Sequence, residues 1–258
     1  MESMLSSAAI TDNLATRFVG QRVLYYPSLP STMDAAREAA QKRAAEGTVV
    51  IAGEQTAGRG RSKRTWLSPR GSLALSLILY PEVAQLPCLI MLASLVVSHS
   101  IEALTGLKPR LKWPNDVLLN GKKVCGILME NSVHGNAVEY AIIGIGINVN
   151  LRLADFPELS PIATSLSEEL GREVSRLELV RRLLVELEKL YLRVRAGESL
   201  YEEWRDSLET LGKKVRVTFA KAVEEGVAES VDEDGSLLLR RADGSLVRIV
   251  AGDVTLRE

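Results

Sequence analysis

Residues 53–66 read Gly-Glu-Gln-Thr-Ala-Gly-Arg-Gly-Arg-Ser-Lys-Arg-Thr-Trp and follow the run TVVIAG, whose β-branched residues are typical of a buried strand. No helical pattern begins after this segment, as a dinucleotide-binding turn would require, and no Gly-Lys-Ser/Thr ends it, as a P-loop would require. Glycine and arginine alternate at Gly58, Arg59, Gly60 and Arg61. Backbone N–H groups and guanidinium groups in such a loop can enclose an anion. The segment therefore predicts an anion-binding loop, although an exposed basic loop without a ligand would have the same composition.

The composition indicates a soluble globular protein and gives no sign of a nucleic acid or a membrane as its partner. Of the 258 residues, 46% are hydrophobic and 25% charged, and the net charge is −1. A nearly neutral chain lacks the positive charge that binds phosphate backbones, and 5% of aromatic residues are few for base stacking. The longest apolar stretch, residues 86–97, is too short to span a membrane and predicts a buried helix. No secretory signal is visible, so a cytoplasmic protein is expected.

The cysteine and histidine residues indicate neither a disulfide nor a metal site. Cys88 and Cys125 lie inside apolar runs, which predicts reduced thiols in the core. His99 and His134 are far apart, and neither has a cysteine or histidine at the spacing of zinc ligands. We therefore expect no zinc site.

The pattern of apolar residues and turns predicts an α+β fold. Strands are expected at residues 23–26, 48–53, 73–80, 110–113, 117–119, 124–130 and 138–149. Helices are expected from the N-cap Ser31 to Gly47, over residues 86–104, and at several places between residues 165 and 211. Asn120-Gly121, the strongest hairpin signal in the chain, joins two of the strands.

The character of the chain changes at Lys213 to short alternating strands. Asp234-Gly235 and Asp243-Gly244 mark tight turns between them. We therefore predict a first domain of residues 1–212, with a mixed β-sheet and helices on one side, followed by a small β-barrel-like domain of residues 213–258.

A second segment with unusual chemistry is Lys112-Trp-Pro-Asn-Asp116, at the end of a short expected strand. A lysine between Leu111 and Trp113 would be poorly solvated unless it faced an anion. The alternative is a surface lysine that extends its ammonium group into solvent. Lys112 is therefore a candidate for a contact with a phosphate or a carboxylate.

Taken together, the GRGR segment, the KWPND segment about fifty residues later and the run Gly-Ile-Gly-Ile-Asn-Val-Asn at residues 144–150 resemble the biotin protein ligases. The similarity extends from Ser31-Thr32 through Gln55, residues 124–130 and residues 163–166 to the small C-terminal β-domain. It implies that residues 1–212 form a class II synthetase-like catalytic domain that binds biotin and ATP, and that residues 213–258 form an SH3-like β-barrel. It also implies an enzyme that forms biotinyl-5′-AMP from biotin and ATP and transfers biotin to a lysine of a biotin carboxyl carrier protein. Mg²⁺ would accompany the triphosphate, although no residue is identifiable as its ligand.

The resemblance also implies roles for individual residues. Lys112 would contact the carboxylate and the phosphate, and Arg61 would hold the adenylate, so these two are the catalytic candidates. Trp66 and Gly126 would pack against the apolar body of biotin, and Asn148 would lie near the adenine. The polar end of the biotin site would be lined by Ser31, Thr32, Gln55 and Arg59, and the loop over the ligand would include Gly58 and Gly60.

Two features depart from the family pattern. Met33 stands where the family has Asn after Ser-Thr, which puts one polar contact or cap in doubt. About thirty residues precede Ser31, too few for the helix-turn-helix domain of bifunctional relatives, so the single-function form without DNA binding is expected. Relatives often dimerise, and a homodimer is compatible with the sequence, although no residue pattern specifies it.

Three other functions are less well supported by the sequence. A lipoate or octanoate ligase of the same superfamily would keep the adenylate chemistry, but the tryptophan of KWPND and the C-terminal β-domain favour biotin. A non-catalytic nucleotide-binding module would hold an anion without releasing pyrophosphate. RNA or DNA binding through the Arg-Lys loop is disfavoured by the nearly neutral charge.

Overall fold

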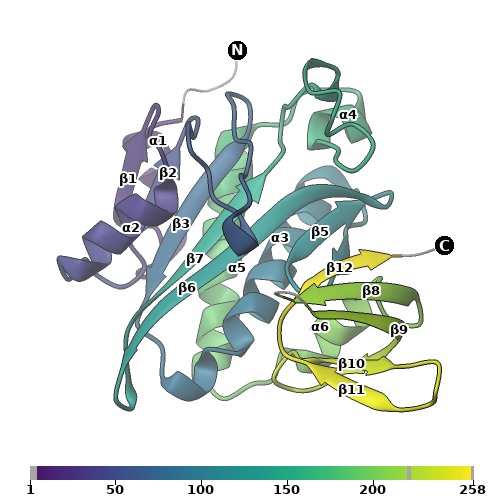
Figure 1. Ribbon diagram of the computed structural model, residues 1–258. Helices are drawn as coiled ribbons and strands as arrows, with labels where there is room; N and C mark the ends of the chain where they lie inside the picture. The colour runs from purple at the N-terminus through teal and green to yellow at the C-terminus, as the bar shows by residue number, and fades with distance from the viewer. Residues whose placement is uncertain (1–4, 220–221, 257–258) are drawn as a thin grey trace.

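Seven strands form a mixed sheet in the computed structural model, which describes residues 5–219 and 222–256 (Figure 1). The strands are β1 (Val23–Tyr26), β2 (Val49–Ala52), β3 (Leu73–Leu79), β4 (Arg110–Lys112), β5 (Asp116–Leu119), β6 (Lys122–His134) and β7 (Ala137–Ile147). They lie in the order β1-β2-β3-β7-β6-β5-β4, and β1 with β2 is the parallel pair among the described strands. The predicted turn at Asn120-Gly121 joins β5 to β6 with positive φ at both residues, as a two-residue hairpin requires.

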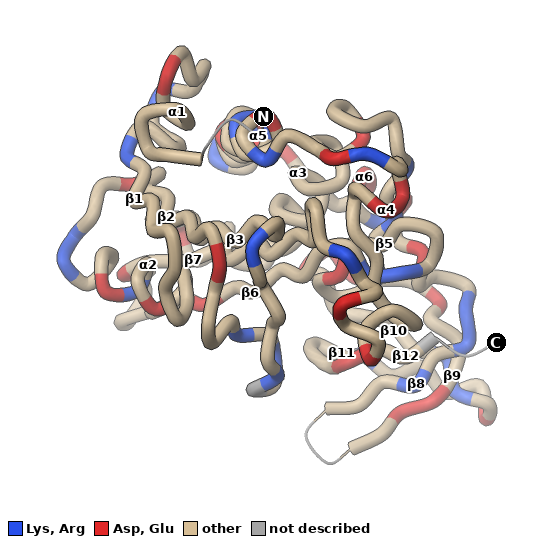
Figure 2. The backbone as a smooth tube through the Cα atoms, turned by 90° about the horizontal axis from the view of Figure 1, so that it is seen from above, with Lys and Arg blue, Asp and Glu red and all other residues tan. Residues whose placement is uncertain are grey.

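Helices cover both faces of this sheet because β3, one of its inner strands, is apolar on both faces. The helix α2 (Thr32–Gln41) packs on one face, and α3 (Cys88–Thr105) and α5 (Arg176–Arg195) pack on the other (Figure 2). Alternation along β3 directs Leu75 and Leu77 into the larger core and Ile78 into the smaller core under α2. The prediction of helices on one side was therefore incomplete. Helix α2 also ends earlier than Gly47, the predicted stop.

The apolar stretch predicted as a buried helix forms α3. By length and composition it is the one helix among the described residues that could cross a membrane, but most of it is buried inside the protein. It ends at Gly106, whose φ of 76° allows the left-handed C-cap. Cys88, in its first turn, and Cys125, in β6, are free thiols, and burial raises the pKa of each. The remaining helices are α1 (Ser7–Thr11), α4 (Leu166–Leu170) and α6 (Tyr201–Ser207).

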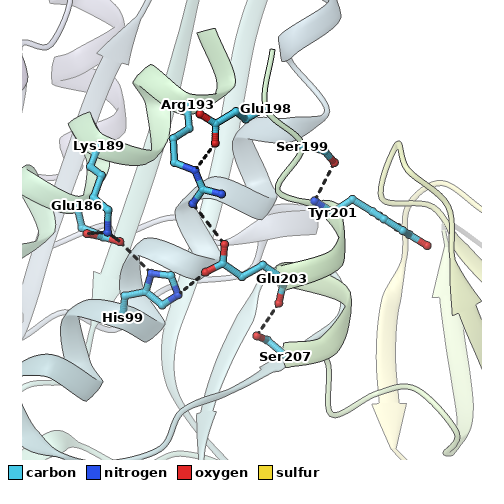
Figure 3. A network of polar contacts seen from close by, with 9 residues as sticks. All are labelled: His99, Glu186, Lys189, Arg193, Glu198, Ser199, Tyr201, Glu203 and Ser207. Atoms are coloured by element: carbon cyan, nitrogen blue, oxygen red, sulfur yellow. Dashed lines mark hydrogen bonds and ion pairs between the residues drawn. The ribbon is translucent and has the colours of Figure 1, made fainter. Parts of the chain in front are cut away.

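A polar network ties α6 to α3 and α5 (Figure 3). The Nδ1 atom of His99 lies 2.9 Å from Glu186 Oε1, and its Nε2 atom lies 3.1 Å from Glu203 Oε1. Two carboxylates facing both ring nitrogens need two N–H donors, which the imidazolium form provides. The hydrogen bond with Glu186, together with the charge of Glu203, accordingly raises the pKa of His99. Because α6 directly precedes the second sheet, this network holds the segment that leads into it.

The second sheet is antiparallel throughout its described strands. They are β8 (Lys214–Phe219), β9 (Ala222–Val231), β10 (Leu237–Arg240), β11 (Leu246–Ile249) and β12 (Asp253–Leu256), in the order β11-β10-β9-β8-β12. Gly235 and Gly244 take the positive φ that their predicted turns require. Apolar side chains of this sheet belong to the same hydrophobic cluster as those of the main sheet, and Trp113 Nε1 donates a hydrogen bond to Gly235 O at 2.8 Å. The division of the chain at residue 212 stays a prediction.

Candidate active site

A cavity of about 170 Å³ lies between the N-terminus of α2, the loop of residues 53–70, the β4–β5 turn and strands β6 and β7. The first residues of β12 complete its wall. The predicted site residues that line the cavity are Ser31, Thr32, Gln55, Arg59, Gly60, Arg61, Trp66, Lys112 and Gly126. Segments far apart in the sequence therefore converge on one cavity, and the candidate site is built around it.

Two predicted residues, Gly58 and Asn148, lie outside the lining of this cavity. A Cβ atom on Gly58 would collide with the Trp66 carbonyl oxygen, so this glycine permits the loop to close on itself. Asn148 is buried, and its Nδ2 atom donates to Thr164 O at 3.0 Å. This amide holds the segment before α4, and the expected contact of Asn148 with the adenine stays a prediction.

Polar side chains line one end of the cavity, at the N-terminus of α2. Gln55 Oε1 accepts hydrogen bonds from Thr32 N at 2.8 Å and from Thr32 Oγ1 at 3.1 Å, and Ser76 Oγ donates to Thr32 Oγ1 at 2.8 Å. Ser31 is the N-cap residue, as predicted, but its side chain does not cap the helix. Its buried Oγ has no partner among the described residues, which leaves a donor and acceptor for a polar ligand.

Trp66 forms the middle of the cavity and lies against two glycines of the sheet. Gly126 of β6 and Gly146 of β7 are direct partners in the ladder. A Cβ atom on Gly126 would come within 3.0 Å of the Trp66 ring, and one on Gly146 would collide with its Nε1 atom. The absence of Cβ atoms thus lets the ring approach the backbone. Gly126 and Gly146 thus form a glycine floor under the Trp66 ring. The Gly-Ile-Gly run that begins at residue 144 could have indicated this floor, but Gly146 was not predicted as a site residue.

Cationic side chains gather at the other end of the cavity. They are Arg61, Arg64, Lys112 and Lys123, and two carboxylates, Asp116 and Asp253, lie among them. The excess of positive charge suits a phosphate ligand. Burial lowers the pKa of Lys112, an effect that the charge of Asp116 opposes. No carboxylate among the described residues forms a direct ion pair with Lys112, so its ammonium group is available to a ligand.

The two arginines of GRGR have different surroundings. Arg61 reaches across to Asn115 Oδ1 at 2.9 Å and to the carbonyl oxygen of Gly252 at 3.1 Å, and burial lowers its pKa. Arg59 instead forms ion pairs with Asp34 at 2.9 Å and Glu130 at 3.0 Å. Arg59 therefore lines the cavity but is neutralised by α2 and β6, whereas Arg61 belongs to the cationic end.

The second sheet contributes to the site through Gly252 and Asp253, two residues that were not predicted. Arg64 Nη2 lies 2.9 Å from Asp253 Oδ2, at the start of β12, and Gly252 accepts the bond from Arg61. Lys123, also not predicted, pairs with Asp116 at 2.7 Å and lies 5.2 Å from the centre of the Trp66 ring. The glycine-arginine loop is thus anchored at one end by Asp34 and Glu130 and at the other by the second sheet.

The charged residues do not form a cage for a divalent cation. In the described ranges, no group of three or more His, Cys, Asp or Glu side chains could hold a metal ion. Asp116 and Asp253, the carboxylates at the cationic end, are both paired with cations. The expectation of Mg²⁺ stays a prediction, and the residues that the structure describes provide no preformed site for it.

The sequence and the fold match those of the biotin and lipoate protein ligases. The family model described as "Biotin/lipoate A/B protein ligase family" matches residues 25–148, and the "Biotin protein ligase C terminal domain" matches residues 210–257. The bifunctional ligase/repressor BirA of Bacillus subtilis is 38% identical over 258 residues, covering 98% of this chain and 79% of the relative. The biotin–[acetyl-CoA-carboxylase] ligase of Paracoccus denitrificans is 35% identical over 214 residues, covering 77% and 86%.

A solved structure agrees with these relatives. The biotin protein ligase from Aquifex aeolicus in complex with biotin and ATP has a TM-score of 0.77 and 29% identity to this chain, covering 92% of this chain and 99% of that one. The chain belongs to the biotin protein ligase family. The predicted family and the α+β fold are confirmed. Because some relatives are named ligase/repressors, the expected absence of DNA binding stays a prediction.

Proposed function

We propose that the protein is an ATP-dependent biotin protein ligase that makes biotinyl-5′-AMP and transfers biotin to a lysine of a biotin carboxyl carrier protein. The observation that carries the proposal is the cavity with two unlike ends, a polar end at α2 and a cationic end at β4, joined by Trp66 over a glycine floor. Relatives named as biotin ligases, and a solved relative with biotin and ATP, support the choice of substrates.

The polar end suits the ureido ring of biotin, and the middle suits its apolar part. Ser31 offers a hydroxyl without a partner, and Thr32 and Gln55 present a connected set of donors and acceptors. Buried polar groups of this kind favour a ligand that completes their hydrogen bonds. We assign the apolar part of the ligand to Trp66 and Gly126, which leaves the carboxylate directed toward the cationic end.

The first step brings together two anions, the biotin carboxylate and the α-phosphate of ATP. A carboxylate oxygen attacks the phosphorus, the bond to the β-phosphate oxygen breaks, and pyrophosphate leaves. Lys112 and Arg61 offset the repulsion and stabilise the charge that develops on the phosphate. Arg61 is held by Asn115 and Gly252 before the substrates arrive, so it needs little reorganisation during the reaction.

In the second step a neutral lysine amine of the carrier attacks the acyl carbon of the anhydride. A C–N bond forms, the C–O bond to AMP breaks, and the amine loses a proton. Arg61 and Lys112 would hold the phosphate of the leaving AMP. The loop of residues 53–70 limits access of water to the anhydride, which would otherwise hydrolyse. Residues 213–258, through Gly252 and Asp253, would help to hold this loop.

A pyrophosphate-release assay with a panel of acids tests the proposal. Biotin should release pyrophosphate, whereas lipoate and octanoate should release little, and a carrier domain should gain biotin on its acceptor lysine by mass spectrometry. Release with lipoate instead of biotin would favour the related ligase. Binding of ATP without release for any acid would favour the non-catalytic module.

A further inference from the structure

We propose that Met33 and Gly144 together set the end of the acid-binding cavity and exclude acids whose ring carries an additional alkyl substituent. This inference rests on the proposed function, because it concerns the selectivity of the same cavity. It assigns that selectivity to a thioether packed against a glycine of the central strand β7.

Met33 lies at the boundary between the cavity and the smaller core. It lines the cavity, yet only 4% of its surface is exposed. Behind it, α2 and the sheet pack closely through the buried residues Ala36, Ala40, Val50, Ile78 and Ile142. The methionine side chain therefore has filled core on one side and the cavity on the other.

Gly144 is the reason that a residue as long as methionine fits at this boundary. A Cβ atom on Gly144 would lie 2.5 Å from Met33 Sδ and 3.2 Å from Met33 Cγ. Gly144 pairs with Ser76 of β3 and Leu128 of β6, so its backbone is fixed by strands on both sides. Any side chain at position 144 would push the thioether away from the strand. Because the core behind Met33 is filled, the thioether would move into the cavity.

The neighbours of Met33 show which part of the ligand it faces. Ser31, the N-cap of α2, and Thr32, its first residue, directly precede Met33, and Gln55 bonds to Thr32, so the polar end of the cavity adjoins the thioether. Methionine offers at most a weak acceptor there, so it limits the ligand by its volume and not by hydrogen bonding. The excluded class is therefore cyclic ureido acids enlarged at the ring by a group about the size of the Cγ, Sδ and Cε atoms of methionine.

Four variants test this inference: Met33→Ala, Gly144→Ala, the double variant, and Met91→Ala as the control. Met91 is a methionine with 1% exposure in the larger core, away from the cavity lining. Each protein is assayed by pyrophosphate release with biotin and with ring-methylated and ring-ethylated biotin. Binding of each acid without ATP is measured by calorimetry, and thermal stability is recorded in parallel.

Met33→Ala should raise the ratio of kcat/KM for the enlarged acids to that for biotin by about tenfold or more, the usual value of a methylene-sized fit. Gly144→Ala should weaken biotin binding by about tenfold, and the double variant should restore it to within about threefold, because the colliding atoms are then absent. Met91→Ala should lose stability without a change in the ratio. Met33→Leu keeps most of the side-chain volume and should retain the wild-type ratio. If Gly144→Ala does not fold, the comparison of Met33→Leu with Met33→Ala tests the inference in its place.

An unchanged ratio in a folded Met33→Ala protein would overturn the inference and reduce Met33 to a core residue. Unaltered biotin binding by folded Gly144→Ala would overturn it as well. A wild-type protein that neither binds biotin nor releases pyrophosphate would refute the proposed function instead, so the two failures are distinguishable.

Discussion

Replacing Lys112 by alanine should abolish most of the first half-reaction. The side chain ends β4 at the cationic end of the cavity, and none of the described carboxylates is paired directly with it. Its burial means that water cannot readily substitute for the lost ammonium group. Loss of one preorganised electrostatic contact of this kind costs on the order of 10²–10³ in rate, or about 3–4 kcal/mol in the transition state. Arg61 and Lys123 remain, so a residual rate is expected.

The assay is single-turnover formation of biotinyl-5′-AMP, with biotin affinity measured separately in the absence of ATP. The rate should fall by about 10²–10³, while biotin affinity should change less, because the contact strengthens as the phosphate gains charge. Lys108→Ala is the matched control. That lysine is 77% exposed and pairs with Glu102 outside the cavity lining, so its loss should leave the rate within about twofold.

The pH profile provides a further test of the same reasoning. Because burial lowers the pKa of Lys112, the free enzyme should lose this positive charge on the alkaline side at a lower pH than an exposed lysine would. The adenylation rate should therefore fall as the pH rises, and this limb should be absent from Lys112→Ala. Near-wild-type adenylate formation by Lys112→Ala would refute the role. Equal losses in biotin affinity and in rate would show a binding contact without a specific contribution to the transition state.

Three further predictions concern other contacts. Arg61→Gly should release biotinyl-5′-AMP early and label a bystander protein, detected by streptavidin blot; wild-type adenylate affinity without bystander labelling would contradict this. Asp253→Asn should lower the adenylation kcat by about two- to fivefold without weakening ATP binding, because it frees Arg64 while removing a negative charge; weaker ATP binding would argue against this account. His99→Gln should lower the melting temperature most in acid. The raised pKa of His99 means that its stabilisation is complete below its unfolded value of about 6.5 and is lost as the pH rises through the folded value. A difference from wild type that stayed constant between pH 5.5 and 9 would contradict the ion-pair role.

Features that depend on local sequence were the ones predicted well. The Asn120-Gly121 turn requires two positive φ values, and asparagine followed by glycine adopts them at low cost, so its position follows from two residues. Helix α3 is apolar on nearly every side, and such a segment in a chain of this composition is buried. The family resemblance assigned Gln55 and Lys112, which lie in distant segments of the sequence, to one site. Both residues line the cavity.

Features that depend on tertiary packing were not predicted. Asn148 follows a strand next to the glycine floor, but its amide turns to Thr164 because the segment before α4 packs there. Arg59 resembles Arg61 in sequence, yet Asp34 and Glu130 neutralise it from elements that only the folded chain brings together. The apolar run of residues 73–80 predicted a strand, but it did not show which helix covers each of its faces.

The contribution of the second sheet illustrates why such contacts need point substitutions and not truncation. Gly252 and Asp253 carry no motif, and they reach the cavity only because β12 pairs with β8 at the edge of this sheet. The same sheet packs its core against Trp113, which neighbours Lys112 and bonds to the Gly235 carbonyl. Removing residues 213–258 would expose Trp113 and disturb Lys112 whatever the role of Asp253, since a large aromatic side chain would lose its buried environment. A fragment ending at Gly212 would thus lose stability and adenylation together. Asp253→Asn changes one contact with Arg64 and leaves that core intact, so it separates a role in holding the loop from a role in covering the core.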